Sequence, residues 1–192
     1  MDIAGIVALA IAACGVVYAV MLYNGLVQLK HNVARAWSNI DVLLKQRHDE
    51  LPKLVETCKQ YMQFEQATLD KVMQARAGVA AAREARNIGA LGTAETSLRA
   101  GLGALFATVE AYPELKASEH FQHMSARITE LENSIADRRE FYNESVNLNN
   151  VRIEQFPDVV IARLFQFEPA QLLEFTAEDR RDADLSALFA PK

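Results

Sequence analysis

The chain has 192 residues, of which 51% are hydrophobic and 23% charged, and its formal net charge is −5. That length suits one domain of ordinary size, or one domain with an appendage. The acidic balance argues against a nucleic-acid-binding protein, which normally presents a basic face. Two cysteines, Cys14 and Cys58, are too few and too far apart for a disulfide framework.

The N-terminal segment is strongly apolar. No charged residue lies between Asp2 and Lys30, and the apolar part, Ile3–Tyr23, has roughly the 20 residues that a helix needs to cross a bilayer. Lysines and arginines, beginning with Lys30, follow this segment, whereas none precedes it. The sequence therefore predicts that residues 1–26 are an uncleaved transmembrane anchor and that the remainder of the chain is cytoplasmic.

A lipoprotein signal is the alternative interpretation of this segment. Ile11-Ala12-Ala13-Cys14 resembles a lipobox in which Cys14 is the lipid acceptor, and lipidation there would place residues 15–192 outside the cytoplasm. The missing basic residue before the apolar core and the continuing apolar run from Val16 to Leu22 favour the uncleaved anchor. In that case Cys14 is a small thiol within the membrane.

Small residues form a stripe at helical spacing along the predicted anchor. Such stripes let helices approach closely and associate in a bilayer. We therefore expect the lipid bilayer and a second copy of the chain as partners, although alanine is also common in anchors generally. The stripe comprises Ala4, Ala8, Ala12, Gly15 and Ala19.

Beyond the anchor, apolar residues recur at helical spacing, without the alternation of a strand. In the first helix after the anchor, the charged residues, including Arg47, are placed mostly away from the apolar face. Pro52 follows an acidic pair and predicts the first turn of a second helix, in which Cys58 fills the core. The apolar face of the first helix comprises Val33, Trp37, Ile40, Leu44 and Leu51.

Two further turn signals divide the middle of the chain. The alanine- and glycine-rich stretch 77–92 predicts a helix end and a turn. A third helix is expected over residues 93–111, where Tyr112-Pro113 stops it.

A fourth helix is expected over 118–153, closed by Pro157, and a short apolar helix over 159–167. Residues 168–192 are acidic and predict a flexible tail. The predicted fold is therefore all-α, with an N-terminal transmembrane helix followed, in residues 27–167, by an antiparallel bundle of about four long helices.

Several segments resemble the LemA family. The first half of the resemblance surrounds Trp37, and the second half follows the third predicted helix. Together the segments span roughly residues 1–168. They are Tyr23–Val27, Val33–Val55, Ala111–Ala117, Ile135–Arg139, Phe141–Asn143 and Phe156-Pro157.

The chain departs from the family pattern at three places. Phe64-Glu65 stands where the family often has His-Glu, Leu148-Asn149 where it often has Tyr-Asn, and Gln166 where glycine is common. The resemblance implies a single-pass anchor in the bacterial inner membrane and a cytoplasmic helical domain. The family has no settled biochemical activity, and one of its branches is associated with building bacterial organelle membranes.

The polar residues do not support an enzyme. His120 and His123 lie on one helical face, but no third ligand accompanies them. His48 begins a segment that faintly resembles the phosphoacceptor box of sensor histidine kinases, yet the chain has no glycine-rich nucleotide-binding segment. We therefore expect no cofactor, no metal site and no catalytic residue.

The apolar face around Trp37 and Ile40 lies close to the predicted membrane, with Asp41 beside it. It is either a core anchor of the first bundle helix or an exposed docking surface. The leading functional hypothesis is a non-catalytic scaffold that self-associates and organises membrane proteins or membrane shape. The alternative is a regulatory adaptor that binds a membrane protease or another membrane partner through its cytoplasmic bundle.

Overall fold

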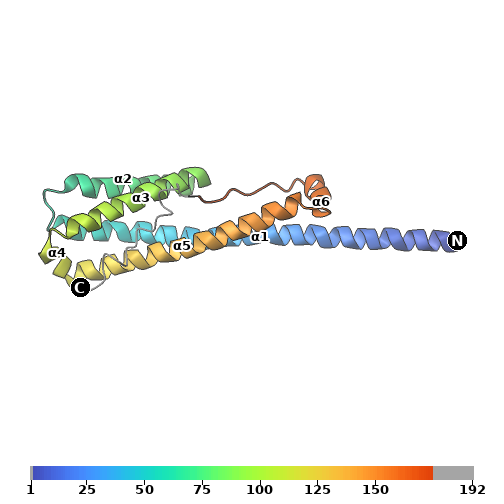
Figure 1. The fold of residues 1–192 in the computed structure, drawn as a ribbon, viewed down its shortest axis with the longest axis horizontal. Helices are drawn as coiled ribbons and strands as arrows, with labels where there is room; N and C mark the ends of the chain where they lie inside the picture. The colour runs from blue at the N-terminus through green and yellow to red at the C-terminus, as the bar shows by residue number, and fades with distance from the viewer. Residues whose placement is uncertain (1, 175–192) are drawn as a thin grey trace. The chain divides into compact units, whose positions relative to one another are not determined.

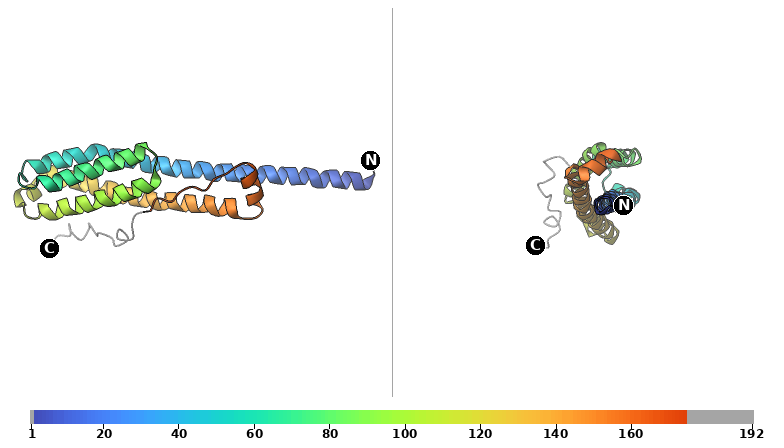
Figure 2. Two further views of the ribbon diagram at one scale, coloured as in Figure 1. Left: turned by 90° about the horizontal axis from the view of Figure 1, so that it is seen from above. Right: turned by 90° about the vertical axis from the view of Figure 1, so that its right-hand side faces the viewer.

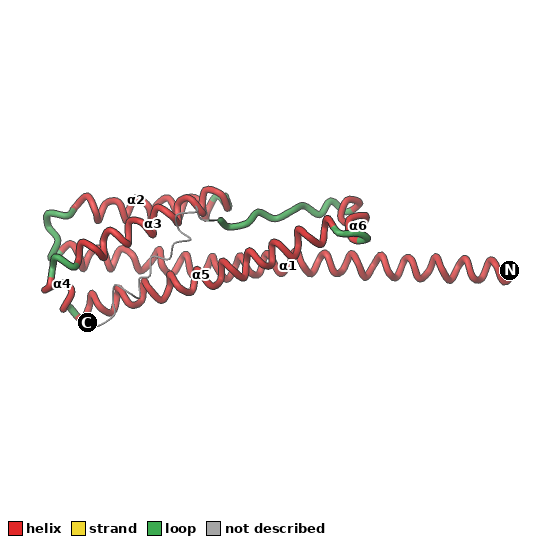
Figure 3. The backbone as a smooth tube through the Cα atoms, viewed as in Figure 1, coloured by secondary structure: helices red, strands yellow, loops and turns green. Residues whose placement is uncertain are grey.

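The structure, a computed structural model, describes residues 2–174, and every regular element within that range is a helix (Figure 3). The predicted all-α fold is therefore confirmed. Four of the helices are long and two are short (Figure 1). They are α1 (Ile3–Lys59), α2 (Gln66–Glu84), α3 (Ile88–Val109), α4 (Pro113–Ala117), α5 (Glu119–Glu154) and α6 (Asp158–Leu164).

The described chain divides into two compact units. Unit 1 comprises residues 2–37 and 141–171, and unit 2 comprises residues 38–140 and 172–174. Helices α1 and α5 therefore each contribute residues to both units.

Unit 2 is a helical bundle around one apolar core. Helices α2 and α3 lie side by side (Figures 1 and 2), and the later part of α1 and the earlier part of α5 supply the other two long segments. Each fully buried leucine or isoleucine contributes roughly 1.5–3 kcal/mol through removal of its surface from water. The largest fully buried apolar side chains of this unit are Ile40, Leu44, Leu51, Leu54, Met62, Leu69, Leu91, Leu98, Leu105 and Leu115.

Pro52 does not begin a new helix, so this prediction was wrong. It lies inside α1, which runs without interruption from Ile3 to Lys59. A proline in a helix lacks the N–H that would bond the carbonyl four residues earlier, which here belongs to His48. The Arg76 side chain on α2 donates its Nε–H to that carbonyl at 2.8 Å. A tertiary hydrogen bond thus replaces the missing helical one, and α1 continues.

The predicted turn within 77–92 is much shorter than expected. Helix α2 continues to Glu84 and α3 begins at Ile88, because alanine, which fills much of this stretch, is the strongest helix former. Arg86 adopts a positive φ of 52° at the end of α2. Asn87 then caps α3 by accepting a hydrogen bond from the Ala90 amide at 3.0 Å.

In unit 1, the last turns of α5 and the short helix α6 pack beside α1. Leu26 of α1, Ile153 of α5 and Ala162 of α6 form a small buried cluster, with Ile161 and Phe167 at its margin. Helix α6 corresponds to the short apolar helix expected over 159–167 and ends a few residues earlier.

The residues after α6 are held in an extended path by side chains of α5. The Asn150 side chain accepts from the Ala170 amide and donates to the Ala170 carbonyl, both at 2.9 Å. The Tyr142 hydroxyl donates to the Gln171 carbonyl at 2.9 Å. These bonds fasten the beginning of the predicted acidic tail, 168–171, to unit 1.

The next residues belong to unit 2. Leu173 is buried there, and the Glu174 backbone passes so close to Gly92 of α3 that a Cβ at Gly92 would collide with the Glu174 carbonyl. A glycine is therefore required at this crossing. The remainder of the predicted tail, 175–192, lies outside the described residues.

The hydrogen bond that compensates for Pro52 can be tested with a double-mutant cycle. Replacing Arg76 with methionine should lower the free energy of unfolding by about 1.5–3 kcal/mol, because a charged donor to a partly buried carbonyl is lost. In a Pro52→Ala background the same change should have a smaller effect, because residue 52 then supplies its own N–H to the His48 carbonyl.

Denaturant unfolding of the full chain in mild detergent, followed by circular dichroism, measures all four variants. Lys71→Met, an exposed change on the same helix, is the control and should alter stability by no more than about 0.5 kcal/mol. Equal effects of Arg76→Met in both backgrounds would contradict the compensation.

Candidate functional site

The apolar part of α1 is bare. By length and composition α1 contains a segment suited to cross a membrane, and 0% of that segment is buried. The first buried side chain of the helix is Leu22. A water-exposed apolar surface of this extent is unusual for a soluble protein and marks a site of membrane or protein contact.

The predicted small-residue stripe lies on this bare segment. Ala4, Ala8, Ala12 and Gly15 are exposed, and Ala19 is half-buried. Gly15 has no neighbouring atom within 4 Å of the position that a Cβ would occupy. Nothing in the described part of the same chain therefore covers the stripe at Gly15.

The predicted docking residues have different surroundings. Trp37 in unit 1 is half-buried and makes an edge-on ring contact with Tyr142, with the centroids 5.8 Å apart. In unit 2, Ile40 is fully buried and Asp41 forms an ion pair with Arg83 at 3.6 Å. The side chains of Ile40 and Asp41 are thus engaged within the bundle.

The two cysteines are both free thiols, one exposed and one buried. Cys14 is exposed on the apolar segment of α1. Cys58 lies in the core of unit 2, as predicted, and burial raises the pKa of its thiol to about 12. The Cys58 thiol is therefore protonated at neutral pH and unsuited to nucleophilic chemistry.

An aromatic cluster joins the end of the apolar segment to the region after α6. The Tyr23 ring lies 4.8 Å from the Phe165 ring and 5.8 Å from the Phe167 ring, measured between centroids. Both contacts are tilted or edge-on, which is the favourable geometry for aromatic pairs. Tyr23 is the last residue of the predicted apolar part, and nothing in the sequence predicted these ring contacts.

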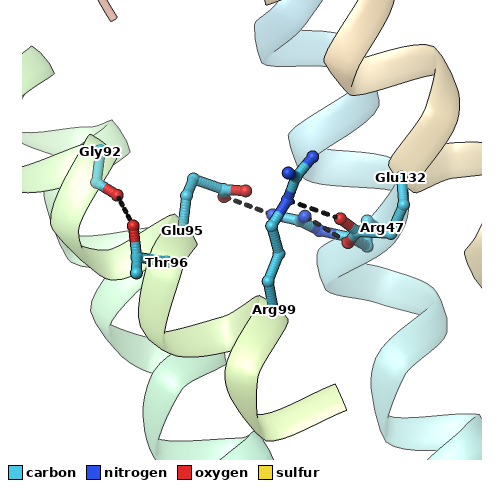
Figure 4. Close-up of polar contacts among 6 residues, drawn as sticks. All are labelled: Arg47, Gly92, Glu95, Thr96, Arg99 and Glu132. Carbon is cyan, nitrogen blue, oxygen red and sulfur yellow. Dashed lines mark hydrogen bonds and ion pairs between the residues drawn. The ribbon is translucent and has the colours of Figure 1, made fainter. Parts of the chain in front are cut away.

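Unit 2 encloses a cluster of charged side chains (Figure 4). Arg47 of α1 donates to Glu132 Oε1 of α5 at 2.5 Å and also to Glu95 Oε1 of α3. Arg99 Nε lies 3.3 Å from Glu132 Oε2. Arg47 is only 1% exposed, so the prediction that it lies away from the apolar face was wrong.

The cluster keeps its charges because each buried ion faces an opposite one. Burial by itself would lower the pKa of Arg47, but attraction to Glu132 and Glu95, together with their hydrogen bonds, raises it above its usual value. Arg47 is therefore permanently charged. The cluster links three helices, α1, α3 and α5, at one level of the core.

A signal for this cluster was present in the sequence. Arg47 stands between Leu44 and Leu51 on the apolar stripe of α1. Glu95 stands between Leu91 and Leu98 on the apolar stripe of α3. A charged residue at a position where the period demands an apolar one indicates a buried, paired charge.

His48, next to Arg47, makes a second polar contact between α1 and α2. Its Nε2 lies 2.7 Å from an Arg76 guanidinium nitrogen. Since a guanidinium is always a donor, Nε2 accepts and the proton resides on Nδ1. Burial and the charges of Arg76 and Arg83 lower the pKa of His48, and Asp49 and Glu84 oppose this shift. His48 is therefore neutral at pH 7.

Within residues 2–174, no three or more His, Cys, Asp and Glu side chains are grouped so that they could hold a metal ion. His120 and His123 are both exposed at the beginning of α5.

The fold and the bare helix together define a class: helical-bundle proteins with one membrane-capable N-terminal helix. The chain matches the LemA family over residues 36–186, which is more than half of its length. It belongs to the LemA family, as its sequence motifs indicate.

Among its relatives, the magnetosome protein MamQ 2 of Paramagnetospirillum magneticum is 25% identical over 177 residues, covering 80% of this chain and 65% of that protein. MamQ of Magnetospirillum gryphiswaldense is 24% identical and covers 77% of this chain and 63% of its own length. Protein LemA of Metamycoplasma hominis is 27% identical, covering 86% of this chain and 74% of that protein. The chain thus spans less than two thirds of the MamQ proteins.

The buried charge cluster leads to a stability prediction. Arg47→Met should destabilise unit 2 by about 3–5 kcal/mol, because Glu95 and Glu132 would then be buried without their shared counter-ion. Adding Glu95→Leu and Glu132→Leu to Arg47→Met should restore most of this loss, since an apolar core replaces the charges.

Chemical unfolding of the full chain in detergent measures both effects. Lys45→Met, two residues away and exposed, serves as the control and should change stability by at most about 0.5 kcal/mol. An Arg47→Met protein as stable as the parent would show that the cluster does not hold the bundle.

The lowered pKa of His48 predicts a pH dependence. The unfolded chain binds a proton at His48 below its ordinary pKa of about 6.5, whereas the folded chain binds it only at lower pH. The stability associated with neutral His48 is therefore complete above that value and is lost as the pH falls below it.

The variant His48→Gln keeps an acceptor for Arg76 without a titratable ring. It should show a weaker fall of the unfolding midpoint between about pH 7.5 and 5.5, the range in which histidine titrates. His120→Gln, at an exposed position, should retain the full dependence. Identical pH profiles for the parent and His48→Gln would refute the assignment.

Proposed function

We propose that this LemA-family protein is a non-catalytic, membrane-anchored scaffold that self-associates and organises membrane proteins or membrane shape. The observation that carries the proposal is helix α1. Its first part is apolar and bare, and its later part supplies core side chains such as Leu44 and Leu51 to a bundle. A single continuous helix of this kind suits an anchor whose covalent continuation is a folded domain.

The charges on α1 support the orientation that we propose. Lys30 and Arg35 are exposed on the first turns after the apolar segment. Basic residues on this side of the segment favour a cytoplasmic location for the rest of the chain and insertion in the bacterial inner membrane. Lipidation at Cys14 would give the opposite arrangement, and it would be shown by an acyl-chain label that the Cys14→Ser variant loses, or by digestion of the bundle when protease is added to intact spheroplasts.

Self-association is proposed through the small-residue stripe. The exposed alanines and the open space at Gly15 leave room for a second helix to approach closely. The relatives named magnetosome proteins add a membrane-related context. Because α1 continues from the anchor into the bundle, association of the anchors would also bring the bundles together.

The stripe is tested by Ala8→Leu and Gly15→Leu. Because no atom of the described residues lies within 4 Å of the Cβ position at Gly15, we attribute an effect of Gly15→Leu to contact between chains. A clash that removes about 1.4 kcal/mol of association free energy raises the dissociation constant about tenfold. Light scattering of the purified full chain in mild detergent reports the mass of the assembly over a dilution series.

Ala10→Leu is the matched control, because position 10 lies on the opposite side of the helix at 3.6 residues per turn. The proposal expects the two stripe variants to shift toward the monomer while Ala10→Leu behaves as the parent. A parent protein that is monomeric throughout, or equal effects of all three variants, would refute stripe-mediated self-association.

The adaptor is the second candidate, and one exposed side chain favours it. Phe64, in the turn between α1 and α2, is 95% exposed, and Tyr61 in the same turn is also exposed. An apolar ring so fully open to water suits a partner that would cover it. The same mass measurement on native membrane extracts distinguishes this candidate, which expects a defined heteromeric complex unaffected by the stripe variants.

A further inference from the structure

Helix α6 in unit 1 has one buried and one exposed apolar face. Asp158 and Ala162 are buried on its inner side, where Ala162 packs on Leu26 and Ile153. The opposite side carries apolar side chains that no described residue covers. We name this surface the α6 face; it comprises Val160 and Leu164 of the helix and Phe156, which lies two residues before it, and these side chains are 57%, 71% and 80% exposed.

The inner side of α6 is firmly held, so the α6 face has a defined direction. Asp158 accepts a hydrogen bond from Arg152 Nε of α5 at 2.6 Å, and the Tyr23 ring contacts Phe165 directly after the helix. Val160 and Leu164 are four residues apart and therefore lie on the same side, away from these contacts.

The position of α6 along α1 is the second observation. Its partners on α1 are Tyr23 and Leu26, and the first buried side chain of α1 is Leu22. Helix α6 thus lies beside the part of α1 where buried side chains end and the bare apolar segment of α1 begins. It runs crosswise to α1 (Figures 1 and 2), as a helix lying flat on a membrane surface would if α1 crosses that membrane.

We propose that the α6 face is a second membrane contact, inserted in the headgroup and acyl boundary of the bilayer that α1 spans. The proposal rests on the membrane anchoring proposed above and adds a lipid-binding surface to it. Short helices with one apolar face bind at this depth, with aromatic and leucine side chains directed into the lipid. Tyr23, at the same level, has the amphipathic ring that favours the interface.

Lipid is the occupant that the position of the face favours. The α6 face lies at the level of Tyr23 along α1, next to the start of a helix surface that is itself suited to lipid. Arg163, exposed on α6, has an aliphatic stem long enough to lie along the lipid boundary while its guanidinium reaches the phosphate level. A protein partner at this level would have to share the surface with the bilayer.

The experiment places spin labels on the full chain in vesicles of phosphatidylcholine and phosphatidylglycerol. Single cysteines at Val160→Cys and Leu164→Cys, in a Cys14→Ser background, report on the α6 face, and the buried Cys58 stays unlabelled. Collision rates with lipid-soluble oxygen and with a water-soluble nickel chelate measure the environment of each label.

Phe141→Cys is the matched control in the same unit. Phe141 is an exposed apolar residue of α5, adjacent to Tyr142, which contacts Trp37. Trp37 lies about 16 Å further along α1 than Leu26, at about 1.5 Å per residue. Val16→Cys, on the bare segment, reports independently on whether α1 is in the bilayer.

The proposal expects the oxygen-to-nickel ratio to be several-fold higher at positions 160 and 164 than at position 141, and high at position 16. Equal ratios at 160, 164 and 141, with a high ratio at 16, would overturn the lipid contact and leave the anchor intact. Labels at 160 and 164 shielded from both reagents would indicate a protein cover, which also overturns it. A low ratio at position 16 would instead refute the proposed anchoring.

Discussion

The continuity of helix α1 is the feature on which both units of this protein depend. A helix satisfies its own backbone hydrogen bonds, so it can pass from an apolar to an aqueous environment without exposing unpaired groups to lipid. In α1 the side chains change while the helical backbone continues: no described residue up to Met21 is buried, and from Leu22 onward residues such as Leu26 and Ile40 are buried against the rest of the chain. The one internal break in its bonding, at Pro52, is repaired from outside by Arg76.

Within unit 2, the buried charge cluster specifies how the helices are aligned with one another. Leucine-rich helices pack in many registers with similar energies, because apolar contacts have little directionality. Arg47, by contrast, reaches Glu95 and Glu132 in only one arrangement of α1, α3 and α5, and any slip would leave buried charges unpaired. The cluster therefore penalises alternative registers more than it adds to stability.

In unit 1, a small number of contacts specify the surroundings of the membrane-capable helix. Tyr23 holds the region after α6, and Asn150 holds the chain at Ala170 through a pair of hydrogen bonds. Gln166 adopts a positive φ of 55° directly after α6, a conformation that glycine adopts more easily and one that lets the chain turn back toward α5. The result is a short crosswise helix whose exposed face lies at the level where bare α1 begins.

Much of this architecture could be predicted from the amino-acid sequence, because it depends on local periodicity. Apolar spacing predicted helices α3, α5 and α6, and the uncharged run after Asp2 predicted a membrane-capable segment. The break between α1 and α2 was not predicted, because the second helix was expected to begin at Pro52. The predicted ends of helices were less accurate where a tertiary contact overrides the local preference of a residue. Pro52 has a strong tendency to start a helix, and only the Arg76 side chain of another helix shows why α1 passes through it.

The proposed contact surfaces could be identified only from the tertiary structure. Whether Arg47 is solvated or buried depends on the charged residues that other helices place beside it. The apolar spacing of α1 indicates that position 47 is buried, but it does not identify the residues that pair with Arg47. The ring contacts of Tyr23 join residues more than a hundred positions apart in the sequence, so no local pattern could relate them. Periodicity identifies which side of a helix is apolar, but only packing determines whether that side is covered by protein or left for another environment.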